Sequence, residues 1–295
     1  MLNMKAVVDV FQAASCLQNE SPTAVDNRTG IMILRLSTHR VLLRVLLPML
    51  FVAAFALQPP QSVAQTRLSV FQSGEQLTYK VKYGFIKLGT LVIRTDGPVG
   101  SNRVQARMQF WTADVPFLDT KDQIKDVIDS HYLNLIRFEE HSQNGDKKVN
   151  KVETYDPSAK TLTYSDDNVS NEVTNNIDPF EDALTLFFNL RAWSQSGASY
   201  SFPMRGRDGE KKVTARFTTQ LSDQESPGTG DNAVKTRVIE GHADMGSSSP
   251  LGANGAFTMY VTNDAAAIPV RIDMKIAVGS ISIVLDKVTR AGWSP

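Results

Sequence analysis

Cysteine is almost absent from this chain of 295 residues, because Cys16 is the only one. A domain that begins after Cys16 cannot form a disulfide bond, so its stability must come from the burial of apolar side chains. Such a domain also has no thiol nucleophile and no thiolate ligand for zinc. The scarcity of cysteine therefore excludes a disulfide scaffold and every mechanism that uses a thiol.

The chain also has no excess of positively or negatively charged residues. The 31 lysines and arginines balance the 31 aspartates and glutamates, and no long basic block occurs beyond residue 64. This balance argues against a nucleic acid or an anionic membrane surface as a partner.

Motifs that carry catalysis or hold a cofactor are missing too. The histidines beyond residue 64 are His131, His141 and His242, and none has a second ligand at a zinc spacing. The glycines near Glu225 and Ser247 fit neither a phosphate-binding loop nor a serine-hydrolase elbow. We therefore expect a protein that is not an enzyme and that uses no cofactor and no metal.

One apolar run stands near the amino end of the chain. Arg35, Arg40 and Arg44 precede the thirteen residues Val45–Leu57, which would reach only about 20 Å as a helix and so are too short to span a bilayer. Small residues, Ser62 and Ala64, stand three and one positions before a cut that would make Gln65 the first residue. The pattern predicts a cleavable signal peptide over residues 32–64, export to the periplasm, and no membrane anchor after cleavage.

The first thirty-one residues do not suit this signal, because Asp9, Glu20 and Asp26 stand ahead of its basic region. We interpret residues 1–31 as a mis-assigned extension and expect translation to begin at Met32. The alternative is a lipoprotein signal that ends at Cys16, although Asp9 interrupts its apolar stretch. Residues 65–295 are then expected to form a single, mainly β domain.

Alternation of apolar and polar residues dominates residues 65–295. Leu77–Tyr83, Val104–Phe110 and Ile281–Val288 are examples, and about a dozen such runs occur. Short turn signals such as Asn144-Gly145 separate them. Strands joined by links this short must pair antiparallel, which predicts a meander or a curved sheet.

One segment breaks the two-residue period and predicts the single substantial helix, over Asp178–Trp193. Asp178 is expected to cap it, Pro179 fits its first turn, and Gly197 lies just past its end. Its wide apolar stripe favours packing on the sheet.

Several short sequence motifs follow one another along the chain. They are Phe71–Tyr79, Gly89 at the opening of a strand, Asp178–Arg191, Ile268–Asp273 and Val278–Ile281. By the order and spacing of these motifs the chain resembles the family of bacterial exported proteins catalogued as domain of unknown function 3108. The resemblance implies one strongly bent, half-barrel-like antiparallel sheet with a helix packed on it, no established activity and no catalytic residues to carry over.

Acidic residues recur between Asp114 and Asp129, but they lack the glycine and the dense oxygen spacing of a calcium loop. Lys121 and Lys125 interleave with them. We interpret the segment as a solvated strand.

Aromatic residues are the most suggestive candidates for a site. A bent sheet over one helix could leave an apolar groove for an acyl chain, and the side chains expected to line it are Tyr79, Tyr83, Phe110, Trp111, Phe138, Phe187 and Phe188. The alternative is that the helix fills the concave face, because 42% hydrophobic residues give no surplus beyond an ordinary core.

The function that fits these observations is a non-enzymatic binding module that carries or senses an apolar component of the cell envelope, with a lipid as the expected partner. A structural or protein-interaction module of the envelope is the first alternative, and an envelope enzyme is the second. The sequence leaves open the oligomeric state and whether the exported protein stays in the periplasm or reaches the extracellular medium.

The expected cleavage can be tested on the protein as the cell makes it. Cell fractionation followed by amino-terminal sequencing should find a chain that begins within a few residues of Gln65, outside the cytoplasm. Recovery of residues 1–64 on cytoplasmic protein would contradict the signal-peptide interpretation.

Overall fold

The computed structural model describes residues 69–112, 119–206, 209–244, 255–276 and 279–295, all within one compact unit, Val63–Pro295. The predicted extension and signal peptide lie outside the described residues. The strands are β1 (Gln76–Tyr83), β2 (Ile86–Pro98), β3 (Arg103–Thr112), β4 (Thr120–Asp129), β5 (Leu135–Asn144), β6 (Lys147–Asp156), β7 (Thr161–Asp166), β8 (Glu172–Asn175), β9 (Ser199–Gly206), β10 (Gly209–Gln224), β11 (Val234–Asp244), β12 (Gly255–Thr262), β13 (Pro269–Lys275) and β14 (Ser280–Thr289).

All fourteen strands form one antiparallel sheet in the order β8-β7-β6-β5-β4-β3-β2-β1-β14-β13-β12-β11-β10-β9. Strands that follow one another in sequence pair with each other, except that β8 and β9 lie at opposite edges of the sheet, and β1 pairs with β14 in its middle. Tight turns impose this order, as at Gly145, whose φ of 58° lets Asn144 pair with Lys147. The predicted mainly β fold, with one antiparallel sheet and one helix, is confirmed.

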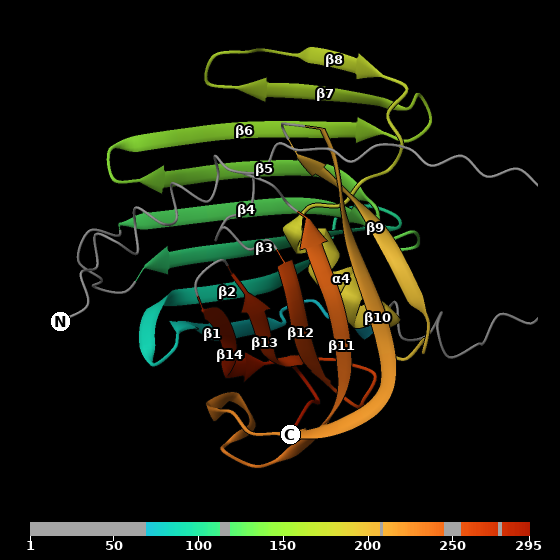
Figure 1. Ribbon diagram of the computed structural model, residues 1–295. Helices are drawn as coiled ribbons and strands as arrows, with labels where there is room; N and C mark the ends of the chain where they lie inside the picture. Colours follow the sequence, from blue (N-terminus) through green and yellow to red (C-terminus); the bar gives the residue numbers. More distant parts are fainter. Residues whose placement is uncertain (1–68, 113–118, 207–208, 245–254, 277–278) are drawn as a thin grey trace, which may run out of the picture. The chain divides into compact units, whose positions relative to one another are not determined.

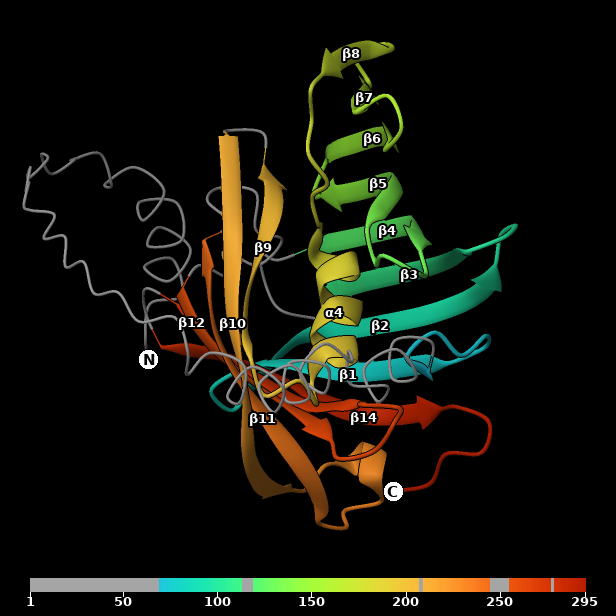
Figure 2. The same ribbon diagram turned by 90° about the vertical axis from the view of Figure 1, so that its right-hand side faces the viewer.

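The sheet is open and strongly bent. Figure 1 shows β2 to β8 stacked above one another, with β9 to β13 running across them. Figure 2 shows the two series as wings that face each other, with the helix between them. We call β1 to β8 the first wing and β9 to β14 the second wing.

The α-helix in the described residues is α4 (Ala183–Trp193), which begins five residues later than predicted. Asp182 caps it, because Asp182 Oδ1 accepts a hydrogen bond from Thr185 N at 2.8 Å. Before the cap, Glu181 N donates to Pro203 O at 2.7 Å, so Glu181 forms a bridge to β9. This bridge holds the backbone extended and explains why Asp178 is not the cap. A short 3₁₀ turn, η1 (Pro227–Thr229), packs on β14.

Helix α4 is buried on nearly every side. Its buried residues are Leu184, Thr185, Phe187, Phe188, Asn189, Leu190, Arg191 and Ala192. A helix that buries its whole circumference must be enclosed rather than laid on a surface. The two wings enclose it, and the core lies between them (Figure 2).

Arg191 fixes the carboxyl end of α4 inside the bend. Its guanidinium is completely buried and binds Glu75 through two hydrogen bonds, Nη1 to Oε1 at 2.7 Å and Nη2 to Oε2 at 3.0 Å. The same group donates to the carbonyl oxygens of Ala266 and Ala267, in the link between β12 and β13. Arg290 Nη1 donates to Glu75 Oε2, the same oxygen that Arg191 Nη2 binds. One carboxylate therefore ties together the helix, the segment before β1 and the segment after β14.

Removing this guanidinium should be costly. Arg191→Met should lower the free energy of unfolding by about 3–5 kcal/mol, because the change breaks a buried pair and leaves two carbonyls without a donor. Urea unfolding followed by circular dichroism measures the loss. Arg216→Met is the matched control, since Arg216 pairs with Glu240 in solvent, and it should cost at most about 1 kcal/mol. Equal losses for the two variants would contradict this role of Arg191.

Candidate functional site

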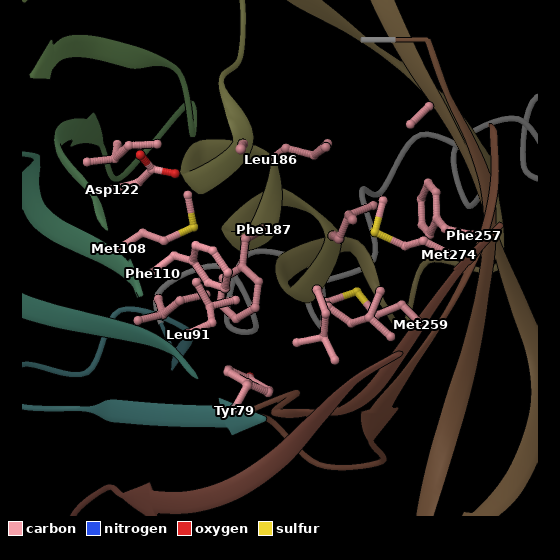
Figure 3. Close-up of a pocket in the computed structure, with 17 residues that line it drawn as sticks. Tyr79, Leu91, Met108, Phe110, Asp122, Leu186, Phe187, Phe257, Met259 and Met274 are labelled. Carbon is pink, nitrogen blue, oxygen red and sulfur yellow. The ribbon is translucent and has the colours of Figure 1, made fainter. Parts of the chain in front are cut away.

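An apolar cavity of about 190 Å³ lies between α4 and both wings (Figure 3). The first wing contributes Tyr79, Leu91, Ile93, Met108, Phe110, Asp122 and Ile124, the helix contributes Ala183, Leu186, Phe187 and Leu190, and the second wing contributes Ala243, Phe257, Met259, Ile272, Met274 and Ile283. The only polar groups on these side chains are the Tyr79 hydroxyl and the Asp122 carboxyl. The cavity is therefore suited to an apolar molecule.

Strand alternation and register bring the lining residues together. Leu91 pairs with Tyr79 on one side and with Phe110 on the other, and Phe110 pairs with Asp122. These four side chains form one row across β1 to β4 on the inner face, which we call the inner row. Since neighbouring strands lie about 4.8 Å apart, the row is about 14 Å long. The helix faces it with positions 183, 186, 187 and 190, which share one helical stripe.

The volume of the cavity limits what it can hold. An apolar cavity of about 150 Å³ in another protein stays dry and binds benzene or xenon. A cavity of about 190 Å³ therefore accepts a ring or a short stretch of alkyl chain. A longer chain would need α4 to move or would have to extend past the opening.

The structure brings three of the seven predicted groove residues into the lining: Tyr79, Phe110 and Phe187. Trp111 cannot join them, because neighbours on a strand point to opposite faces. Its side chain, 40% exposed, lines a second cavity of about 580 Å³ whose other residues are mostly polar. In register, Trp111 lies opposite Lys121.

The other three predicted residues line neither cavity. Phe188 meets the Phe187 ring edge to face and stacks on Phe71, with the ring centroids of Phe188 and Phe71 4.7 Å apart. Phe138 lies farther along the first wing, where Lys151 Nζ is 4.8 Å from its ring. Tyr83 ends β1, after a register irregularity between Val81 and Lys82. Strand parity and distance along the sheet thus separate the aromatic residues that line the apolar cavity from those that do not.

Tyr79 occupies the closed end of the inner row. It is completely buried, and burial raises the pKa of its phenol, which stays neutral. Its hydroxyl has no hydrogen-bond partner among the described residues. The closed end therefore offers one neutral hydroxyl, and the charges nearest to it, Arg191 and Glu75, are already paired with each other.

Asp122 occupies the other end of the inner row, and the sequence analysis missed it. The side chain is half-buried, and burial, followed by repulsion from Glu140, raises its pKa to about 6. The prediction of a solvated strand is wrong here. The available signal was parity, since Asp122, Ile124, Asp126 and Ile128 share one face and the two isoleucines are buried.

Asp126, two residues further along β4, faces the amino end of α4 and is completely buried. Burial holds its pKa well above the ordinary 3.8, and the nearby Asp182 raises it further. Thr185 Oγ1 donates to Asp126 Oδ2 at 3.3 Å, whereas Asp126 Oδ1 and Asp182 Oδ2 lack a donor among the described groups. A proton on Asp126 that hydrogen-bonds to Asp182 satisfies both carboxyls. We call these two residues the acid pair.

Glu181 adds a third buried carboxyl beside the acid pair, and burial raises its pKa as well. In the described part of the chain, no group of three or more histidines, cysteines, aspartates or glutamates is arranged to hold a metal ion. The hydrogen bonds of Asp126 with Thr185 and Asp182 link β4 to the amino end of α4.

The acid pair should make stability depend on pH. Because the pKa of Asp126 is raised on folding, its contribution is complete below the ordinary pKa of 3.8 and is lost as pH rises through the native value. The substitution Asp126→Asn keeps a hydrogen-bond donor at this position and removes the carboxyl that titrates. It should therefore raise the free energy of unfolding at pH 8 by about 1–3 kcal/mol and change it little at pH 4.

Urea unfolding between pH 4 and pH 8 measures the effect of this substitution. The control is Asp223→Asn, since Asp223 is exposed and pairs with Lys235 at 2.8 Å. Destabilisation by Asp126→Asn of equal size at every pH would contradict the shared proton.

Comparison with solved structures supports the fold. A beta-barrel-like protein of domain of unknown function DUF1849 from Brucella abortus matches with a TM-score of 0.51 and 10% identity, over 76% of this chain and 100% of that one. A putative exported protein with a YmcC-like fold from Bacteroides fragilis gives 0.36 and 13%, over 74% and 97%. The lipoprotein LppX from Mycobacterium tuberculosis gives 0.24 and 14%, over 78% and 96%.

Of these three, the Brucella protein alone exceeds a TM-score of 0.5, and at 10% identity it shows a shared fold and nothing more. No curated protein matches the chain. The described residues contain no helix long and apolar enough to cross a membrane. The model of one family, described as "Protein of unknown function (DUF3108)", matches residues 78–286, so the predicted family is confirmed and the chain belongs to it.

Proposed function

We propose that this protein is an exported, non-enzymatic binding module that holds the apolar part of a cell-envelope component between its bent sheet and α4. The observation that carries the proposal is the cavity of about 190 Å³, which both wings and the helix line almost entirely with apolar side chains. The predicted signal peptide over residues 32–64 supports export.

The apolar lining favours an apolar ligand energetically. An alkyl chain that enters the cavity removes its own apolar surface and that of the lining from water. This burial is worth about 0.8 kcal/mol per methylene.

The lining is adaptable in a way that suits chains of differing shape. Met108, Met259 and Met274 reach the cavity from β3, β12 and β13 (Figure 3). Methionine is unbranched and flexible, so it adjusts to irregular apolar surfaces. The lining can therefore tighten around a thin chain or yield to a thicker one.

One opening of the cavity lies at the amino end of α4. Asp122, Ala183 and Leu186 are half-buried lining residues at this end, and Leu91, Met108, Ile272 and Met274 are half-buried as well, whereas Tyr79 at the other end of the inner row is completely buried. A chain that enters beside Asp122 would run along the inner row toward Tyr79.

Ligand binding can be tested with neutral probes. Residues 65–295 should bind the small neutral fluorophore 1-naphthol, and n-octanol should displace it. Ala243→Leu fills part of the cavity and should weaken both ligands at least tenfold, with stability unchanged or raised. Ala256→Leu is the control, because Ala256 lies opposite His242 on the outer face of the second wing, and it should leave binding intact. If octanol does not bind, or if Ala243→Leu binds it normally, the interaction module becomes the better interpretation.

A further inference from the structure

We propose that the ligand is an amphiphile with an amine headgroup, whose ammonium binds the Asp122 carboxylate at the opening while its alkyl chain follows the inner row toward Tyr79. This inference rests on the proposed function, because it needs an alkyl chain in the cavity. The inference adds to that function the chemical class of the ligand's polar headgroup.

The two ends of the inner row differ in what they offer a polar group. The Tyr79 end is closed and supplies one neutral hydroxyl. A charged headgroup placed there would lose its water and gain a single weak partner, which is unfavourable. The Asp122 end is half-buried, carries a charge and reaches solvent. The headgroup therefore belongs at Asp122, and the apolar middle of the row, Leu91 and Phe110, belongs to the chain.

The charge at this opening selects the sign of the headgroup. Glu140 lies on the same face as Asp122, opposite Ile124 in register, and its repulsion contributes to the raised pKa of Asp122. A carboxylate or phosphate headgroup would bring a further negative charge to these two. An ammonium relieves the repulsion and brings three hydrogen-bond donors.

The other charged groups around the opening do not reverse this preference. Asp122 also borders the second cavity, where Lys121, His141 and Lys148 lie, but by strand parity and register these three belong to the outer face of the sheet. Lys151 lies opposite Glu140 on β6, but its Nζ pairs with Glu153 at 3.1 Å. The helix brings Ala183, Leu186 and Phe187 to the cavity and no basic side chain. A helix amino terminus favours anions, yet here the cap is Asp182, whose own carboxylate accepts the Thr185 N–H.

Three probes that share an eight-carbon chain separate the headgroup from the chain. At pH 7, n-octylamine should displace the fluorescent probe about tenfold more strongly than n-octanol, because a charge-assisted hydrogen bond adds to the same burial. n-Octanoate should bind more weakly than n-octanol. Affinity for the amine should rise about fourfold for each methylene until the cavity is full.

The preference for the amine should depend on pH with a definite sign. The native pKa of Asp122 is raised to about 6, so the unbound carboxyl is mostly protonated at pH 5 and ionised at pH 7. Ammonium binding favours the ionised form, and the affinity for n-octylamine should therefore increase from pH 5 to pH 7 while that for n-octanol stays constant.

Asp122→Asn should abolish both the preference and its pH dependence, leaving the three probes within about threefold of one another. Asp223→Asn removes the same charge from an exposed ion pair far along β10 and should change neither. The ranking of probes on the unaltered protein tests the inference even if the Asp122 variant does not fold.

The failures of the two proposals can be told apart. If n-octanol binds and n-octylamine is no tighter, or if n-octanoate is the tightest of the three, the amine headgroup is wrong and the apolar site stands. If none of the three displaces the fluorescent probe, the proposed function fails and the inference fails with it.

Discussion

The arrangement of the molecule depends on the buried ion pair between Arg191 and Glu75. Two wings of one sheet could close on each other and expel any helix, yet the guanidinium holds the end of α4 to both the segment before β1 and the link after β12. An unpaired charge at this depth would be strongly destabilising, so the pair enforces one position for the helix. With α4 fixed there, the bend cannot collapse, and the cavity beside Phe187 follows from that spacing.

Much of the fold was predictable because it depends on local rules. Alternation located the strands, and Asn-Gly and similar turns required antiparallel neighbours, which the continuous order of β1 to β8 confirms. The pairing of β1 with β14 was not predictable, since it joins residues about two hundred positions apart that no turn connects. The predicted start of the helix at Asp178 was wrong for a similar reason. Asp178 and Pro179 form a plausible helix start, and the contact that overrides it comes from Pro203 on β9.

The candidate site was predictable only in part. Aromatic residues indicated an apolar groove, and Tyr79, Phe110 and Phe187 do line the cavity. Composition could not show which of the seven aromatic residues line the cavity, although strand parity alone places Trp111 and Phe110 on opposite faces of the sheet. The inward orientation of the acidic residues of β4 was harder to predict, because a charged side chain among lysines is typical of a solvated strand. That Asp122 and Asp126 face inward depends on a helix whose position comes from distant contacts.

The central claim is that the space beside α4 is a ligand site and not a packing defect. Three methionines line it, Met108, Met259 and Met274, whereas Met204 is buried elsewhere in the core. Methyl NMR of residues 65–295 labelled with [¹³C-methyl]methionine, titrated with n-octanol, distinguishes a ligand site from a packing defect. If the space is a ligand site, those three methyl signals should shift saturably and the Met204 signal should stay in place. Stationary signals from all three, or equal shifts that include Met204, would contradict it.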